Sequence, residues 1–290
     1  MALEFLGDLA TPIMRGILLG GLYTVIAMGL SLVFGVMKLV NLAHGDLVVL
    51  GSYLGFAAMT MLGMDPILSL VMAIPLMFVI GFLIQKYIMS RAFKISMEAP
   101  LILAFGISLI LQNTFQILWT PLSRGLTTSY ALKSFSVGVL HVPLVYLLDF
   151  IGGLAVMLFL SEFLKRTYLG KAITASSQDR VAAQLMGINT ERTYEFAFGI
   201  AMAFAAIAGV LLGLTFPFTP VSGGPFLIIA MGVVILGGLG SIKGTFIGGI
   251  AFGLAQTLGG YFFGVAAQML VAYIMVFIVL AVRPQGIFGR

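Results

Sequence analysis

Long apolar stretches alternate with short polar segments along almost the whole chain. Each stretch is apolar on all sides, which indicates membrane-crossing helices; barrel strands would alternate apolar and polar residues. A crossing takes about 20 residues, and runs of suitable length lie at residues 12–36, 47–63, 66–85, 99–119, 142–164, 194–214, 226–242, 245–262 and 265–282. Because the second and seventh runs are short, the pattern predicts an all-α, polytopic membrane protein with about eight or nine transmembrane helices.

The composition supports this fold class. Hydrophobic residues make up 61% of the 290 positions and charged residues only 9%, whereas a soluble domain carries about 25% charged residues. A soluble enzyme, a nucleic-acid-binding protein and a disordered scaffold are therefore excluded. The chain contains no cysteine, which rules out disulfides, thiolate metal sites and thiol catalysis.

The positions of the basic residues predict the orientation of the helices. Lys86, Arg91 and Lys94 follow the third run, and five more basic residues lie between residues 165 and 192. Basic loops of helical membrane proteins face the cytoplasm, so both clusters are expected there. Nine crossings then place the N-terminus outside and the C-terminus in the cytoplasm. Prolines and glycines at 217–225 mark an outside turn.

The first interruption of the apolar pattern lies near residues 38–46. An ordinary cytoplasmic turn would leave Asn41, His44 and Asp46 solvated. A broken or re-entrant segment would instead use them to line a cavity, as in the broken helices of transporters. At depth Asp46 needs a partner, for which His44 and Lys38 are the nearest candidates in the sequence. One histidine and one aspartate do not form a metal site, and none is predicted.

A second interruption, near residues 237–244, is rich in glycine. Ile242 separates Ser241 from Lys243, so the segment lacks the order of residues in a phosphate-binding P-loop, and its glycines do not match the dinucleotide-binding motif. It is interpreted as a break between two membrane helices. Its place in the second half of the chain resembles that of the first break, which suggests an internal repeat of the kind that transporters use.

Glycine is abundant throughout, with 36 copies. Pairs at four-residue spacing include Gly16 with Gly20 and Gly249 with Gly253. This spacing allows two helix backbones to approach closely inside a membrane. It predicts tight packing within the bundle and is not evidence of dimerisation.

The longest polar interval spans residues 165–192. Its apolar residues have roughly helical spacing, and Gly187 is placed to end that helix. A helix of this kind is too polar to cross the membrane and too short to be stable alone. It either packs on its own bundle or offers a docking surface to a cytoplasmic partner.

Four segments together resemble a known family. Residues 21–46 are similar to the opening of permease subunits of branched-chain amino acid ABC importers of the LivH type. Gly170 through Asp179 to Ile188 resembles the cytoplasmic coupling segment of that family, 237–249 its glycine-rich late segment, and 283–289 its usual ending. The segments occur in order over nearly the whole chain, so the combination is specific although each segment alone is weak.

The resemblance implies one transmembrane permease domain over residues 1–290, with a coupling segment at about 165–192, in a bacterial or archaeal plasma membrane. The permease would form half of the pathway for branched-chain or related hydrophobic amino acids. The implied partners are a second, related permease, two cytoplasmic ATPases and an extracytoplasmic binding protein. ATP and Mg would be used by the ATPases, and no cofactor is expected in this chain.

Two groups of candidate residues follow from the breaks and from the resemblance, and no catalytic residue is expected. The candidates for the pathway are Asn41, His44, Gly45, Asp46, Gly238, Gly240 and Ser241. The candidates for coupling to the ATPases are Gly170, Ala172, Ala175, Asp179, Ala183 and Gly187. Asn41, His44 and Asp46 are equally compatible with a structural role in holding the broken segment.

Three other classes of membrane protein fit the sequence less well than an importer. An ion-coupled amino acid carrier needs ionisable residues inside the membrane, and Asp149 is the only carboxylate well inside an apolar run. No filter motif of a channel is visible. Ser241, His44 and His141 lack the arrangement expected of an intramembrane protease. An importer of the same type for urea or amides remains an alternative.

Overall fold

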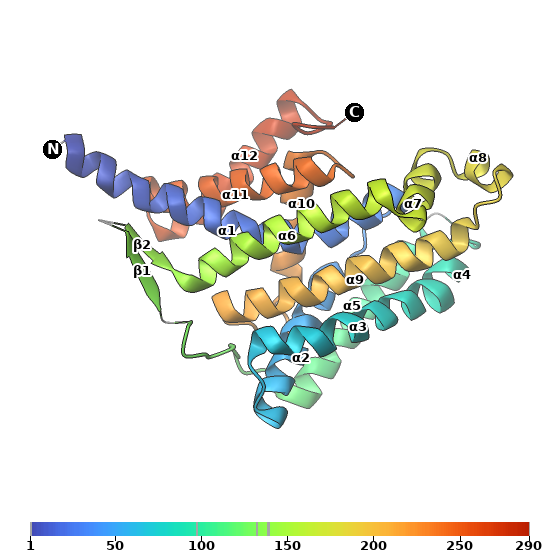
Figure 1. Ribbon diagram of the computed structural model, residues 1–290, viewed down its shortest axis with the longest axis horizontal. Helices are drawn as coiled ribbons and strands as arrows, with labels where there is room; N and C mark the ends of the chain where they lie inside the picture. Colours follow the sequence, from blue (N-terminus) through green and yellow to red (C-terminus); the bar gives the residue numbers. More distant parts are fainter. Residues whose placement is uncertain (1, 97, 132, 138–139, 290) are drawn as a thin grey trace.

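The computed structural model describes residues 2–96, 98–131, 133–137 and 140–289, and these residues are almost entirely helical (Figure 1). The helices are α1 (Ala2–Met37), α2 (His44–Leu62), α3 (Pro66–Ile84), α4 (Ser90–Ala92), α5 (Ala99–Trp119), α6 (Leu144–Arg166), α7 (Tyr168–Gln178), α8 (Arg180–Leu185), α9 (Thr190–Thr215), α10 (Gly223–Gly237), α11 (Ile242–Phe263) and α12 (Gln268–Val282). A π-helical turn, Gln85–Met89, joins α3 to α4. The strands β1 (Ser134–Val137) and β2 (Leu140–Pro143) form an antiparallel hairpin.

The number of membrane helices agrees with the prediction. Within the described residues, eight helical segments are long and apolar enough to cross a bilayer. The ninth apolar helix is α10, which has only 15 residues and corresponds to the short seventh run of the sequence. The all-α, polytopic fold class is therefore confirmed.

The two basic clusters lie at the same end of the molecule. The β1–β2 hairpin lies beside the N-terminal half of α1, and α4, α7 and α8 lie at the opposite end (Figure 1). At that end Lys94 Nζ is 3.4 Å from Glu191 Oε1, and the guanidinium of Arg180 is 5.6 Å from the centre of the Tyr194 ring. The first contact connects the segment after α4 with α9, and the second connects α8 with α9.

The core is built around α1 and α9, the two most deeply buried membrane helices. The glycine pairs of α1 and α11 meet, as their spacing predicts: a Cβ atom added at Gly20 would lie 2.5 Å from the Cα atom of Ile250. Such backbone contact supplies van der Waals packing where lipid provides no hydrophobic drive. Thr245 Oγ1, on α11, also donates a hydrogen bond of 2.8 Å to Ser31 Oγ on α1.

The architecture contains an inverted repeat. The long helix α1 packs antiparallel on α11, with Gly20 near Ile250 and Gly35 near Gly240. The long helix α9 likewise packs on α3, and the two run in opposite directions (Figure 1). Each long helix is followed by a non-helical segment and then by α2 or α10, and these two helices meet. The order α1–α2–α3 is thus repeated, with opposite orientation, by α9–α10–α11.

The predicted internal repeat therefore exists, but its two breaks were paired wrongly. Residues 38–43 follow α1, so their counterpart is residues 216–222, which follow α9. The glycine-rich segment near 237–244 connects α10 to α11, as residues 63–65 connect α2 to α3. The error has a simple cause, because a surface turn and a re-entrant break interrupt an apolar pattern in the same way.

Candidate transport site and coupling segment

The helix α2 begins inside the bundle and not at its surface. Lys38 is exposed and has a φ of 55°, which reverses the chain after α1. His44, the first residue of α2, places Nε2 2.8 Å from the carbonyl oxygen of Ile26. Ile26 precedes Met37 by eleven residues, or about 16 Å along α1 at 1.5 Å per residue. The start of α2 is therefore about halfway across the membrane.

Two side chains hold this re-entrant segment in place. His44 is fully buried, and because a carbonyl oxygen only accepts, Nε2 carries the proton that it donates to Ile26. Asn41 Oδ1 accepts a hydrogen bond of 3.1 Å from the backbone N–H of Ala43. Within the described residues, Nδ1 of His44 and Nδ2 of Asn41 have no hydrogen-bond partner. Both groups are enclosed by protein, so neither is within reach of a solute in this arrangement of the chain.

Asp46 lies in the first turn of α2 and is 2% exposed. Its carboxylate accepts a hydrogen bond of 2.5 Å from Ser108 Oγ and one of 3.1 Å from Gln112 Nε2, both on α5. The predicted partners were wrong, since His44 binds a backbone carbonyl and Lys38 is exposed. Ser108 and Gln112 are four residues apart and share one face of α5. This polar face on an apolar helix is the pattern in the sequence that could have indicated a partner for Asp46.

The N-termini of α2 and α10 meet at this carboxylate. A Cβ atom added at Gly45 would overlap the carbonyl oxygen of Gly223, and one added at Gly223 would overlap the carboxylate of Asp46. Only glycine fits at either position. The N-terminus of a helix carries a partial positive charge, so both half-helices favour negative charge here. Half-helices with this geometry form substrate and ion sites in membrane transporters.

The other predicted pathway residues lie elsewhere. Gly238, Gly240 and Ser241 follow the far end of α10, whose 15 residues span about 21 Å. Ser241 Oγ accepts a hydrogen bond of 3.2 Å from the N–H of Gly244 and so caps α11. Gly240, with a φ of 81°, packs on Gly35. These three residues are not brought together with Asp46.

The same glycine-rich turn is paired with the end of the chain. The backbone N–H of Ile287 donates to the carbonyl of Leu236 at 2.9 Å, and that of Phe288 donates to the carbonyl of Gly237 at 3.2 Å. Gly238 has a φ of 97° and lies against the backbone of Gly289. Two of the four segments that carry the family resemblance therefore form one structural unit.

Two capped helices, α7 and α8, make up the polar interval. Thr167 Oγ1 accepts a hydrogen bond of 2.9 Å from the N–H of Gly170 at the start of α7. Asp179 Oδ1 accepts bonds of 2.8 and 3.0 Å from the N–H groups of Val181 and Ala182 at the start of α8. Each bond satisfies a helix-end donor that would otherwise lack a partner. Gly187, with a φ of 82°, ends this unit as predicted.

The predicted coupling residues fall into two classes by exposure. Gly170, Ala172 and Ala183 are buried against the bundle of this chain, and Ala175 is half-buried. Asp179 and Gly187 are exposed. The first alternative therefore holds for α7, which packs on its own bundle, while the rest of the segment is exposed. Its contact with a partner stays a prediction.

Four large side chains of this segment are exposed but were not among the predicted coupling residues. They are Tyr168, Val181, Leu185 and Met186, and Leu185 and Met186 are each 83% exposed. We call them the apolar cap. They lie among the basic residues of this segment, outside the helices that are long and apolar enough to cross a membrane. The available signal was the presence of large apolar residues in the most polar part of the chain.

Asp149, the second buried carboxylate, belongs to the packing of the core. It is on α6, fully buried, and Oδ2 accepts a hydrogen bond of 2.8 Å from Thr215 Oγ1 at the end of α9. Its backbone lies against Gly21 of α1. Among the described residues, no group of three or more His, Cys, Asp or Glu side chains is placed to hold a metal ion.

Comparisons with known proteins agree with this architecture. Residues 13–280 match a family model described as the permease component of the branched-chain amino acid transport system. The chain is 32% identical to the high-affinity branched-chain amino acid transport system permease protein BraD of Pseudomonas aeruginosa, over 96% of this chain and 95% of that protein. It is 31% identical to LivH of Escherichia coli, over 95% and 94% of the two chains.

An archaeal protein and a solved structure extend the comparison. The probable branched-chain amino acid transport permease LivH of Methanocaldococcus jannaschii is 29% identical over 94% of this chain and 90% of that protein. The solved structure of PsaBC from Streptococcus pneumoniae in complex with Fab contains a similar chain, with a TM-score of 0.54 and 15% identity. The match covers 99% of this chain and 98% of that one, and it supports the fold alone.

Proposed function

Since the chain belongs to the family of branched-chain amino acid transport system permeases, we propose that it is a single permease domain forming one half of the pathway of an ATP-driven importer. The proposed substrates are branched-chain or related hydrophobic amino acids. The observation that carries the proposal is the apolar cap, which the membrane bundle presents at its basic end. A self-sufficient carrier has no use for such a surface.

The proposed partners are those of an ABC importer. Two cytoplasmic ATPases would bind and hydrolyse ATP with Mg, an extracytoplasmic protein would deliver the solute, and a second, related permease would complete the pathway. An ATPase docked on the apolar cap would move α8 with it. Because α8 contacts α9 through Arg180 and Tyr194, that movement reaches the core. Docking shifts the equilibrium between the outward-open and inward-open states of the permease only if the ATPase binds the two states with different affinity.

We place the pathway along the exposed face of α5. Asn41, His44 and Asp46 are at most 2% exposed, so they are closed off within one chain. Gln112 is half-buried and connects Asp46 to the surface of α5, where Asn113 and Gln116 are exposed. Polar residues on a membrane helix are expected to face protein or water and not lipid. A second permease packed on α5 would enclose this face.

The proposal is tested by transport in a reconstituted system. Vesicles holding this chain, its partner permease, both ATPases and a binding protein should take up labelled leucine only with ATP. The buried carboxylates Asp46 and Asp149 make an ion-coupled carrier the second candidate. Uptake that continues without the ATPases and follows an ion gradient would favour the carrier. Transport of urea or an amide in place of leucine would keep the mechanism and change the substrate.

Substitution of Leu185 by aspartate should weaken docking of the ATPases. A charge in the centre of an apolar interface costs about 2 kcal/mol or more, corresponding to about thirtyfold weaker binding. Leu185 is 83% exposed, so the fold should not change. Binding is measured by titrating purified ATPase onto the permease pair. Leu122→Asp, at a residue 65% exposed in the opposite loop, is the matched control, and equal binding by both variants would refute this docking site.

The proposed orientation, with the N-terminus outside and the C-terminus in the cytoplasm of a plasma membrane, can be tested by labelling. Because the natural chain has no cysteine, a single introduced cysteine is the one thiol of this chain that a reagent can label. Lys133, which precedes β1, and Lys171, in α7, are exposed, and β1 and α7 lie at opposite ends of the molecule (Figure 1). A membrane-impermeant thiol reagent added to intact cells should label Lys133→Cys, and it should label Lys171→Cys only after permeabilisation. The reverse pattern would invert the topology.

A further inference from the structure

The helix α5 covers Asp46 and the meeting point of α2 and α10. Its buried side is a single stripe that consists of Pro100, Ala104, Ser108 and Phe115, and its other side chains are exposed or half-buried. Ser108 binds the carboxylate of Asp46, which is only 2% exposed. A solute can therefore reach Asp46 from this side only if α5 moves away from α2.

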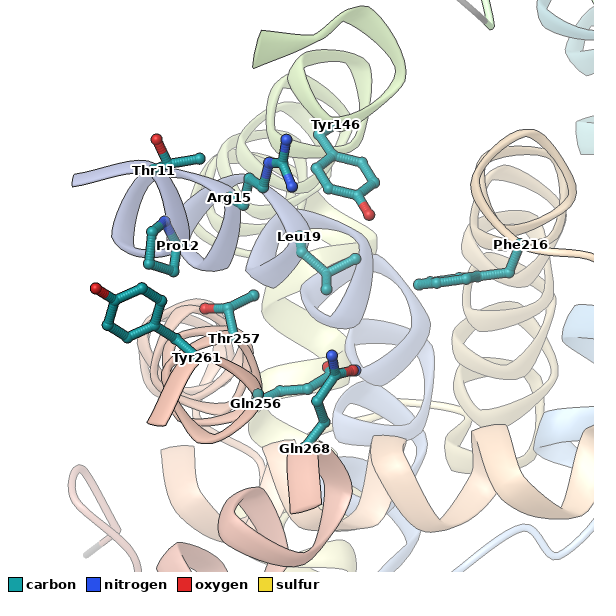
Figure 2. A pocket seen from close by; sticks show the side chains of 11 residues that line it. Thr11, Pro12, Arg15, Leu19, Tyr146, Phe216, Gln256, Thr257, Tyr261 and Gln268 are labelled. Atoms are coloured by element: carbon teal, nitrogen blue, oxygen red, sulfur yellow. The ribbon is translucent and has the colours of Figure 1, made fainter. Parts of the chain in front are cut away.

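The second repeat contains a counterpart of α5 that is packed more closely. The helix α5 follows α3 and packs on α2, whereas α12 follows α11 and packs on both α10 and α11. A Cβ atom added at Gly259 of α11 would lie 2.7 Å from the Cβ atom of Val271 in α12. Figure 2 shows Gln268 of α12 beside Gln256 of α11. A Cβ atom added at Gly106 of α5 would instead meet nothing within 4 Å.

The chain beyond each of these two helices is also attached differently. Residues 287 and 288, after α12, form backbone hydrogen bonds with Leu236 and Gly237, the last two residues of α10. Arg124, after α5, instead exchanges two backbone hydrogen bonds of 2.8 Å with Phe218, which follows α9. The segment after α12 is thus fastened to the helix on which α12 packs, whereas the segment after α5 is fastened to a different part of the bundle.

Aromatic rings hold the outer end of α5 against α2. Tyr53 is seven residues after Asp46 on the same face of α2, and its ring centre is 4.8 Å from that of Phe115 and 4.7 Å from that of Trp119. Tyr53 is fully buried, and within the described part of the chain its hydroxyl has no hydrogen-bond partner. A buried hydroxyl without a partner is unfavourable, and it would gain one from water if α5 moved away.

The chain leaves α5 through a strained residue. Thr120, which follows Trp119 directly, has a φ of 63° and a ψ of 164°, a conformation that is essentially restricted to glycine. Arg124 holds it there, because Nη2 donates hydrogen bonds of 3.1 Å to the carbonyl of Trp119 and 3.3 Å to Oγ1 of Thr120. Strained residues of this kind cluster at segments that switch. Residues 120–123, between α5 and the fixed Arg124, are therefore placed to act as a hinge.

We propose that α5 is a gate helix, which separates from α2 about residues 120–123 during the transport cycle and exposes Asp46 to the pathway. The proposal rests on the transport function proposed above. The hydrogen bonds to Asp46 and the aromatic rings favour the closed arrangement, whereas the Tyr53 hydroxyl and the Thr120 backbone oppose it. A partner that binds the open arrangement more tightly therefore shifts the balance, while α12 stays in place.

The test measures how fast a buried cysteine on α5 reacts with a water-soluble thiol reagent. Ala104→Cys lies on the buried stripe, and Ala272→Cys on α12 is the matched control, since both alanines are 0% exposed. The complete transporter is held in nanodiscs with its binding protein and leucine. ATP should accelerate labelling of Ala104→Cys about tenfold and leave Ala272→Cys unchanged. Equal rates with and without ATP, or equal acceleration of both, would refute the gate. Leu111→Cys, half-buried on α5, replaces Ala104→Cys if the latter unfolds.

Addition of Tyr53→Phe to the Ala104→Cys chain tests the role of the hydroxyl. The change keeps the ring and removes the group that opposes closure, so labelling with ATP should be about tenfold slower. Tyr261→Phe, at a residue 41% exposed on α11, should change nothing. A higher midpoint of thermal unfolding with unchanged labelling would mean that Tyr53 only fills the core, and would refute its part in the gate.

Uptake of leucine by the natural complex in vesicles separates this proposal from the proposed function. ATP-driven uptake without accelerated labelling of Ala104→Cys would refute the gate and keep the importer. Accelerated labelling without uptake of leucine would keep the gate and change the substrate. The absence of both would refute both.

Discussion

Replacement of Gly223 by alanine should destabilise the protein by about 3 kcal/mol, whereas replacement of its neighbour Gly224 should have almost no effect. The first Cβ atom would overlap the carboxylate of Asp46 and lie 2.7 Å from the backbone nitrogen of the same residue. Backbone cannot move away without separating α2 from α10. A Cβ atom at Gly224 would meet nothing within 4 Å, so the two variants differ only in this contact.

The measurement is the midpoint of thermal unfolding of each purified variant in the same detergent. Gly224→Ala is the matched control, because it adds one methyl group to the same turn of α10. Gly45→Ala should behave like Gly223→Ala, since its Cβ atom would overlap the Gly223 carbonyl from the other side. Equal midpoints for Gly223→Ala and Gly224→Ala would show that the two half-helices do not meet as described.

Replacement of Asp46 by alanine should lower ATP-driven uptake by about a hundredfold while the complex still assembles. The change leaves Ser108 and Gln112 without the acceptor that holds α5 against α2. Each unsatisfied buried donor costs about 1–3 kcal/mol, and a cost of about 3 kcal/mol in total lowers the population of the arrangement in which α5 packs on α2 by about a hundredfold. Assembly should survive, because the packing of α1 and α9 does not involve this carboxylate.

Uptake and co-purification of the partner subunits must be measured on the same preparations. Glu98→Gln is the control, since it removes an exposed carboxylate at the start of α5. Lost uptake with intact assembly would show that transport needs the contact that Asp46 makes between α2 and α5. Lost assembly would instead mean that Asp46 only holds the re-entrant segment, and unchanged uptake would exclude both roles.

The membrane helices could be predicted from the sequence because each is a local property of the chain. An apolar run of about 20 residues needs no information from distant residues. For the same reason, the basic residues after α3 and α6 predicted that these two segments lie at the same end of the molecule. The ion pair between Lys94 and Glu191 agrees with this prediction. Local spacing also predicted a helix that ends at Gly187, but the structure divides it into α7 and α8 at Asp179, whose backbone is extended.

The site could be predicted only in part, because its contacts are between distant segments. Asp46 and Gln112 are separated by 66 positions, and no pattern near Asp46 indicates α5. The depth of the break before His44 depends on its bond to Ile26, which sequence spacing does not reveal. Burial was equally hidden: Ala172 and Leu185 both fit a helical face, yet one is 5% and the other 83% exposed.

The long helix of each repeat packs on a helix of the other repeat, and this arrangement has a consequence for biosynthesis. The glycine face of α1 is covered by α11, whose first residue, Ile242, is made 205 residues after Met37. At about 5–20 residues per second, translation takes roughly 10–40 s to reach it. During that time α1 stands in the membrane with its closest packing surface against lipid or the insertion machinery. A ribosome that stalls after α9 would therefore leave α1 without its partner, and quality control could recognise the unfinished chain by that face.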